Sequence, residues 1–172
     1  MDFFSEQEFD LSPILVFLKS KKKDLKYQKF DLNTLFNRNI IQLQCEKDVL
    51  KLEFTYFPFP QIEKPVVKNK IKIDGILDIA TNKLFTIYQK PRSRDFIDLY
   101  MIIQKYGYTI NELLKKSKSK FDWHVDPIKL GSQFIKAKKI KDYPKLLEKI
   151  NHQKWQEFFI KEAKRLKLKI LK

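Results

Sequence analysis

Two acidic residues at predicted strand positions are the first candidates for chemistry in this sequence. Asp2 directly precedes two phenylalanines, which places it at the end of a short apolar strand. Glu53 lies in the segment VLKLEFTYFPFP, where Lys51, Glu53 and Thr55 alternate with apolar residues until Pro58 ends the strand. Carboxylates on neighbouring strands can hold Mg²⁺ for phosphoryl transfer, because the metal needs acidic ligands on rigid elements. The structural alternative places Glu53 on the solvent face of a half-buried sheet and Asp2 in a turn.

A lysine and an Arg-Asp pair on two consecutive predicted helices form the second candidate group. Lys83 shares a helix face with apolar residues, so its ammonium group either snorkels to solvent or meets an anion. The next helix opens with Arg94 and Asp95, and Asp98 follows three residues after Asp95. The structural alternative is again ordinary, because a helix dipole favours an acid in the first turn and Arg94 can pair with a nearby carboxylate.

The combination of these features along the chain resembles the AbiEii family of nucleotidyltransferase-like proteins. In DIATNKLFTIYQKPRSRDFIDLY (78–100), a lysine-bearing helix is followed by a helix of the family's form RDxxDLY. The segment DFFSEQEFDL resembles the region after the family's paired-aspartate strand and matches Asp2 to the second aspartate of Asp-x-Asp. VLKLEFTYFPFP resembles the later strand, with Glu53 in the third acidic position. The resemblance covers roughly residues 1–105.

This resemblance implies an α+β protein with part of a polymerase-beta-like nucleotidyltransferase fold, in which a small mixed or antiparallel sheet precedes a helical bundle. It implies transfer of a nucleotidyl group from a nucleoside triphosphate to an RNA, such as tRNA, or to a protein, and a cognate antitoxin protein as partner. In the implied catalytic set, Asp2 and Glu53 bind Mg²⁺, Lys83 meets triphosphate oxygens and Asp95 orients the lysine or the acceptor. The implied nucleotide-binding residues are Lys83, Arg94 and Asp98. We expect Lys83 and the acids at positions 2, 53 and 95 to converge on one cleft between the sheet and the first long helix.

Two features of the family's pattern have no counterpart in this sequence. The family's Gly-Gly-Thr-type turn and its first metal-binding aspartate would precede Asp2, and the three glycines (Gly75, Gly107 and Gly131) lie isolated downstream. We therefore expect an N-terminally truncated relative, whose enzymatic activity the sequence leaves open. The alternative to transfer is a catalytically impaired remnant that binds nucleic acid or an antitoxin through a basic surface, and a purely structural basic domain is the third hypothesis.

Periodicity predicts an α/β lobe over residues 1–73 and a helical bundle over residues 74–172. In the lobe we expect a strand ending at Phe4, a helix over 9–20, strands around 25–30, 40–45 and 49–57, and a short edge segment over 66–73. In the bundle we expect helices over 74–89, 93–106, from Thr109, over 127–139 and from Tyr143 to about Leu166. Ser93, Asp126 and Asp142 are candidate N-caps, and Gly107 is a candidate C-cap.

Composition adds a strong positive charge and excludes several classes. The formal net charge is +15, which favours polyanionic partners, although a lysine-rich composition also gives basic surfaces without function. Cys45 is the only cysteine, and His124 and His152 have no metal-ligand spacing, so we expect neither a disulfide nor a cysteine or histidine metal site. The acidic N-terminus lacks signal-peptide features and no segment is long and apolar enough to span a membrane, so we expect a cytoplasmic protein. Lys161–Lys172 alternates lysine with Leu and Ile, which suits phosphate contacts, an acidic partner or a frayed end.

Overall fold

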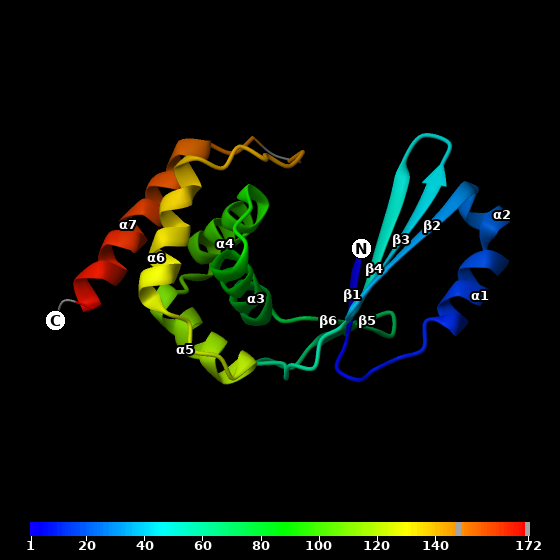
Figure 1. The fold of residues 1–172 in the computed structure, drawn as a ribbon, viewed down its shortest axis with the longest axis horizontal. Helices are drawn as coiled ribbons and strands as arrows, with labels where there is room; N and C mark the ends of the chain where they lie inside the picture. Colours follow the sequence, from blue (N-terminus) through cyan, green and yellow to red (C-terminus); the bar gives the residue numbers. More distant parts are fainter. Residues whose placement is uncertain (147–148, 171–172) are drawn as a thin grey trace. The chain divides into compact units, whose positions relative to one another are not determined.

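The chain forms two compact units, Met1–Pro60 and Gln61–Lys172, in a computed structural model that describes residues 1–146 and 149–170. The first unit is a sheet with two helices, and the second is a bundle of helices with a short hairpin (Figure 1), so the predicted α+β class is confirmed. The first unit contains β1 (Asp2–Ser5), α1 (Ser12–Ser20), α2 (Lys22–Leu25), β2 (Tyr27–Leu35), β3 (Arg38–Cys45) and β4 (Val49–Tyr56). The second contains β5 (Val66–Lys68), β6 (Ile71–Ile73), α3 (Ile76–Gln89), α4 (Ser93–Tyr106), α5 (Ile110–Phe121), α6 (Pro127–Ile135), the 3₁₀ turn η1 (Lys136–Lys138) and α7 (His152–Ile170).

The sheet of the first unit is mixed, with the strand order β1-β4-β3-β2. The edge strand β1 runs parallel to β4, and the other two pairings are antiparallel. One face of the sheet is apolar because alternate residues of each strand point to the same side. On this face the buried Ile41, Leu43 and Leu52 pack with Leu18 of α1, so the amphipathic helix covers the apolar face and leaves the other face polar.

The β2–β3 hairpin is longer than periodicity predicted. We expected the first of its strands to end near residue 30, but β2 continues to Leu35 and pairs with Arg38 across a two-residue turn. Residues 31–35 lack a dense apolar pattern because their side chains lie mostly on exposed sheet surface. Backbone pairing with β3 therefore decides their conformation, and propensity alone does not reveal it.

The segment 66–73, predicted as one edge segment, is a hairpin of β5 and β6. Its turn residues Asn69 and Lys70 have φ values of 51° and 65°, both in the left-handed region. Two consecutive positive φ values are the requirement of the tight turn that matches strand twist, and Asn tolerates this conformation better than most residues. The turn divides segment 66–73 into two strands, and neither of its two central residues is the glycine that usually signals such a turn.

Several helix boundaries in the second unit agree with their capping signals. α4 spans Ser93–Tyr106 as predicted, and Gly107 ends it with a φ of 75° that a side chain would strain. Thr109 caps α5 in a capping box with Glu112, whose side chain accepts a bond from the Thr109 backbone N–H. Asp126 caps α6 through the N–H groups of Ile128 and Lys129. These signals are local, which is why they can be read from the sequence.

Two predicted N-caps were wrong, and they turn out to contact each other. Ser93 is the first residue of α4 and not its cap, since Arg92 takes the N-cap position. α7 begins at His152 rather than Tyr143, and Asn151 accepts the N–H of Gln153 at its start. Asp142 instead accepts the Ser93 N–H at 3.0 Å, and its carbonyl oxygen accepts the Ser93 hydroxyl at 2.6 Å. An acid thus satisfies the start of a helix 49 residues earlier in the chain, a pairing that local spacing cannot predict.

The core of the second unit is built around aromatic residues from three helices. Phe96 of α4 stacks on Trp155 of α7 at 5.8 Å and meets Phe159 edge-on at 4.7 Å, and Phe134 of α6 completes the group. All four side chains are fully buried.

None of the helices in the described residues has the length and apolar content that a membrane crossing requires.

A buried ion pair joins α3 and α5 inside this unit. The Lys120 ammonium donates to the Asp78 carboxylate at 2.5 Å, and the two side chains are 1% and 0% exposed. The same carboxylate accepts the backbone N–H groups of Ile62 and Glu63 at 2.9–3.1 Å. The Asp78 carboxylate therefore links the start of the second unit to both α3 and α5.

Breaking this ion pair should destabilise the protein strongly. Lys120→Met leaves the Asp78 charge buried without its cation, a change that costs about 3–5 kcal/mol in buried pairs. Urea unfolding of the variant and of the parent protein measures the difference. Lys118→Met on the exposed face of the same helix is the matched control, and its free energy of unfolding should stay within about 0.5 kcal/mol. Equal stability of the two variants would show that the pair contributes nothing.

Stability should also depend on the protonation of Asp78. Burial by itself raises the pKa of this carboxyl, but the Lys120 hydrogen bond and the two backbone N–H groups outweigh it, so the pKa lies below its usual 3.8. A lowered folded-state pKa gives stability that is present above pH 3.8 and is lost as pH falls through the lower folded value. Urea titrations at a series of acidic pH values should therefore show less pH dependence for Asp78→Asn than for the parent. An unchanged pH dependence would contradict this assignment.

Candidate functional site

The first predicted pair of acids lies on adjacent strands of the sheet. Asp2 of β1 and Glu53 of β4 are direct partners in the parallel register. Neighbouring strands are about 4.8 Å apart, and partnered residues point to the same face, so the two side chains project from the polar face side by side. Asp2 is exposed, whereas the Glu53 side chain is only 14% exposed. The sequence predicted this pairing only as one of two alternatives.

Two cations on the same sheet face hold the Glu53 carboxylate. Arg38 of β3 lies 3.3 Å from one carboxylate oxygen, and Lys51, two residues earlier on β4, lies 2.5 Å from the other. Within the described residues no group of three or more His, Cys, Asp or Glu side chains could hold a metal ion. The donor set suits Mg²⁺ nonetheless, because this ion commonly uses one or two carboxylates and takes its other ligands from water and substrate phosphates. Arg38 and Lys51 place two positive charges beside the Glu53 carboxylate.

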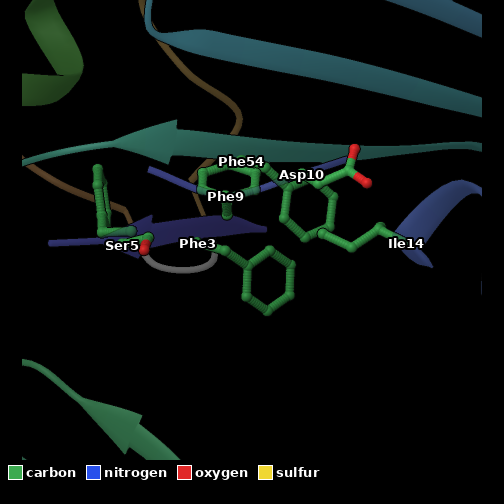
Figure 2. A pocket seen from close by; sticks show the side chains of 7 residues that line it. Phe3, Ser5, Phe9, Asp10, Ile14 and Phe54 are labelled. Atoms are coloured by element: carbon green, nitrogen blue, oxygen red, sulfur yellow. The ribbon is translucent and has the colours of Figure 1, made fainter. Parts of the chain in front are cut away.

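An apolar pocket occupies the opposite face of the same strands. Figure 2 shows Phe3, Phe9, Phe54 and Ile14 around it, with Ser5 and Asp10 as its polar members. Phe3 and Phe54 stack at 4.9 Å, and strand alternation puts them on the side away from Asp2 and Glu53. The Asp10 carboxylate is engaged at the start of α1, where it accepts the Ser12 N–H and the pKa of Asp10 is lowered by that bond. The pocket therefore lacks the charged groups of the acid pair.

The second predicted group meets at the crossing of α3 and α4. The Lys83 ammonium lies 3.1 Å from Asp95 and 2.5 Å from Asp98, so a single cation from α3 bridges both acids of α4. The second carboxylate oxygen of Asp95 accepts the Arg92 Nε–H at 2.8 Å. Asp95 is thus surrounded by two cations, in a helix first turn whose dipole also favours negative charge.

The side chains of this group differ in their exposure to solvent, so some are fixed by burial and others are accessible. Asp95 is 3% exposed, Lys83 26% and Asp98 48%. A buried carboxylate between two cations is held firmly, because an unpaired charge in its place would carry a large desolvation cost. Asp98 is in contact with solvent and holds the same ammonium only by a surface contact. The ammonium of Lys83 is therefore positioned by Asp95 and reachable from the Asp98 side.

The arginine that pairs with Asp95 is Arg92 and not Arg94. Arg92 precedes Asp95 by three residues at the helix start, whereas the next arginine is exposed. The i, i+3 spacing of Arg92 and Asp95 is a sequence signal for this pair, whereas we expected Arg94 to pair with a nearby carboxylate. The Asp78–Lys120 pair was missed as well, although Lys120 shares a face of α5 with Leu113 and Ser117, as an inward lysine would.

The predicted site residues thus form two groups, one in each compact unit. Asp2 and Glu53 lie together in residues 1–60, and Lys83, Asp95 and Asp98 lie together in residues 61–172. A common cleft for both groups stays a prediction.

His152 stacks on Tyr143 at 4.0 Å and accepts the Trp155 indole N–H, which is a packing role. The basic stretch predicted from Lys161 is helical to Ile170, and the last two residues lie outside the described part of the chain.

Residues 10–165 match the model of the family described as "Nucleotidyl transferase AbiEii toxin, Type IV TA system". The match includes Glu53 and all residues of the Lys83 group, and it begins after Asp2. A curated relative, the uncharacterized protein aq_aa25 of Aquifex aeolicus, is 36% identical over 76 residues, which are 43% of this chain. The chain matches 37% of the length of that relative.

Two solved structures from Helicobacter pylori share the fold. One is JHP933, with a TM-score of 0.53 and 18% identity over 98% of this chain and 75% of its own. The other is a protein described as a candidate nucleotidyltransferase, with a TM-score of 0.55 and 19% identity over 99% of this chain and 79% of its own. At this level of identity the similarity is one of fold alone.

Proposed function

Because the chain belongs to the AbiEii nucleotidyltransferase toxin family of type IV toxin–antitoxin systems, we propose that it transfers a nucleotidyl group from a nucleoside triphosphate to an RNA acceptor. The observation that carries the proposal is the Lys83 ammonium, held by the buried Asp95 and open toward the exposed Asp98. A cation fixed in this way is pre-organised for an anion, which is the main contribution that proteins make to phosphoryl-group transfer.

The triphosphate is the anion that suits Lys83 best. A phosphate oxygen can take the place of the Asp98 carboxylate, because that contact is half exposed to solvent and therefore weak. Asp95 keeps its bonds to Lys83 and Arg92 during this exchange, so the ammonium stays in position. The exposed Arg94 on the same turn supplies a further cation for the nucleotide, as the family resemblance implies.

Asp2 and Glu53 are our proposed ligands of Mg²⁺. Their side-by-side placement on β1 and β4 supplies two carboxylates on rigid elements. When bound, Mg²⁺ would neutralise the charge that develops on the phosphate oxygens in the transition state. The protein's part is to keep the two acids in register and to hold Glu53 between Arg38 and Lys51 until the ion arrives.

The family also implies partners beyond the nucleotide. A type IV pair consists of a toxin and a cognate antitoxin, so we propose that an antitoxin protein exists for this chain. The acceptor follows from charge: a net charge of +15 favours RNA, including tRNA, over a neutral acceptor. A protein acceptor is the alternative, and it would be labelled in the same assay.

Transfer should be dependent on Mg²⁺ and on Lys83. We expect the chain to label RNA from radiolabelled nucleoside triphosphates in the presence of Mg²⁺, and we expect Lys83→Met to lower the rate by about 100-fold or more, because it removes a group that meets the transferring phosphates. Lys90→Met, at the exposed end of the same helix, is the matched control and should keep the parent's rate. Asp2→Asn and Glu53→Gln should each reduce labelling at low Mg²⁺ more than at high Mg²⁺.

Calorimetry separates the two hypotheses that the sequence left open. Nucleotide binding without transfer, lost in Lys83→Met, would leave a binding protein with an impaired catalytic site. Absence of both transfer and nucleotide binding in the folded protein would overturn the proposal.

A further inference from the structure

The net surplus of positive charge in this protein lies in one of its two units. Residues 1–60 contain nine Lys or Arg and nine Asp or Glu, so the first unit is formally neutral. Residues 61–172 contain 27 basic and 12 acidic residues, which accounts for the whole surplus of 15. A charge surplus that came only from a lysine-rich composition would be spread over both units. The partition makes the helical unit the part whose net charge favours polyanionic ligands.

Within the helical unit, the segment Lys136–Lys145 has a high density of positive charge. Its sequence, KAKKIKDYPK, has five lysines and a single acid. All five lysines are exposed, whereas Ala137 is fully buried and Ile140 packs against the core. Inward apolar residues thus alternate with outward lysines over residues 136–141, which follow α6 in Figure 1.

Two adjacent residues fasten this lysine segment to the bundle. Asp142 accepts the Ser93 N–H at 3.0 Å and the Ser93 hydroxyl at 2.6 Å, which attaches the segment to the first turn of α4. Tyr143 stacks on His152 at 4.0 Å, which attaches it to the first turn of α7. The single acid of the segment is therefore used for structure, and the lysines extend from a backbone that is held on both sides.

The attachment places the lysine segment beside the Lys83 group. Ser93 lies between Arg92, which bonds Asp95, and the exposed Arg94. Lys141 directly precedes Asp142, and consecutive Cα atoms are about 3.8 Å apart, so its backbone is next to this turn of α4. We propose that the exposed lysines of Lys136–Lys145 bind the phosphate backbone of the acceptor RNA and bring it to the Lys83 group. The inference rests on the proposed function, for which it names the surface that receives the acceptor.

The composition of the segment favours RNA over a protein partner. Protein interfaces are enriched in aromatic residues, Met and Arg at their centres and depleted in Lys. The exposed side chains here are chiefly lysines, which are typical of contacts to phosphates. Five lysines along ten residues also exceed what a single nucleotide could engage, whereas a strand of RNA offers a phosphate at each nucleotide.

Salt-dependent RNA binding tests the surface. The probe is a fluorescent single-stranded oligo(U) RNA of about 20 nucleotides, titrated in the absence of nucleotide and Mg²⁺. The triple variant Lys138→Gln/Lys139→Gln/Lys141→Gln should bind at least tenfold more weakly and reduce the slope of log K against log salt by about 2. The matched control is Lys115→Gln/Lys116→Gln/Lys118→Gln on the exposed face of α5, with the same change of charge in the same unit. Equal losses in the two triple variants would overturn the proposal, because binding would then be diffuse.

A second pair of variants tests the attachment through Asp142. Asp142→Ala and Asp142→Asn both raise the net charge by one, so bulk electrostatics predicts slightly tighter RNA binding for each. Asn keeps a side-chain oxygen that can accept the Ser93 N–H, whereas Ala does not. We expect Asp142→Ala to bind RNA several-fold more weakly than Asp142→Asn, at equal thermal stability of the core as judged by near-UV circular dichroism. Tighter binding by Asp142→Ala would show that the segment needs no anchor.

These measurements can overturn the RNA-binding surface without overturning the proposed transfer function, and the reverse also holds. Loss of RNA binding in the Lys138 triple variant supports the surface even if the parent protein shows no transfer. Active transfer by a parent whose RNA affinity is unchanged in that triple variant overturns the surface and leaves the transfer function standing.

Discussion

The stability of the helical unit depends on the contacts of the buried Asp78 carboxylate. This carboxylate has no exposure to solvent, and it is compensated by the Lys120 ammonium and by the backbone N–H groups of Ile62 and Glu63. Because a buried charge is costly unless it is paired, loss of any of these partners should lower the stability of the unit. The contact fixes α3 against α5 and ties down the start of the unit, and α3 is the helix that carries Lys83.

The candidate site also contains a buried aspartate paired with a cation, but the exposure of the cation differs. Asp95 is buried between Lys83 and Arg92, as Asp78 is buried beside Lys120. Asp98, however, leaves the Lys83 ammonium with one partner that faces solvent. A fully enclosed pair can only hold the fold together, whereas a cation with one exchangeable partner can also accept a ligand. The difference in exposure between the two groups therefore separates a structural ion pair from a candidate binding site.

The distribution of charge gives the two units different electrostatic roles. The sheet unit is formally neutral and presents the Asp2–Glu53 pair with two cations beside it. The helical unit carries the whole surplus of 15 and holds its densest lysine segment against the start of α4 through Asp142. Long-range attraction of a polyanion is a property of summed charge, while its final position depends on anchored residues. Both are present in the helical unit.

The sequence by itself determined the features that depend on neighbours along the chain. The α+β class, the end of α4 at Tyr106, the Gly107 and Asp126 caps and the RDxxDLY pattern of the family follow from short-range spacing, which needs no knowledge of the fold. The tertiary structure alone decided which polar groups meet across long separations: Asp142 with Ser93 over 49 residues, and Lys120 with Asp78 over 42. Asp142 has the same local signal as a true N-cap, so spacing assigned it to the wrong helix. The physical reason is that a carboxylate binds whichever donors packing brings to it, and helix packing is set by the whole apolar pattern rather than by the residues beside the acid.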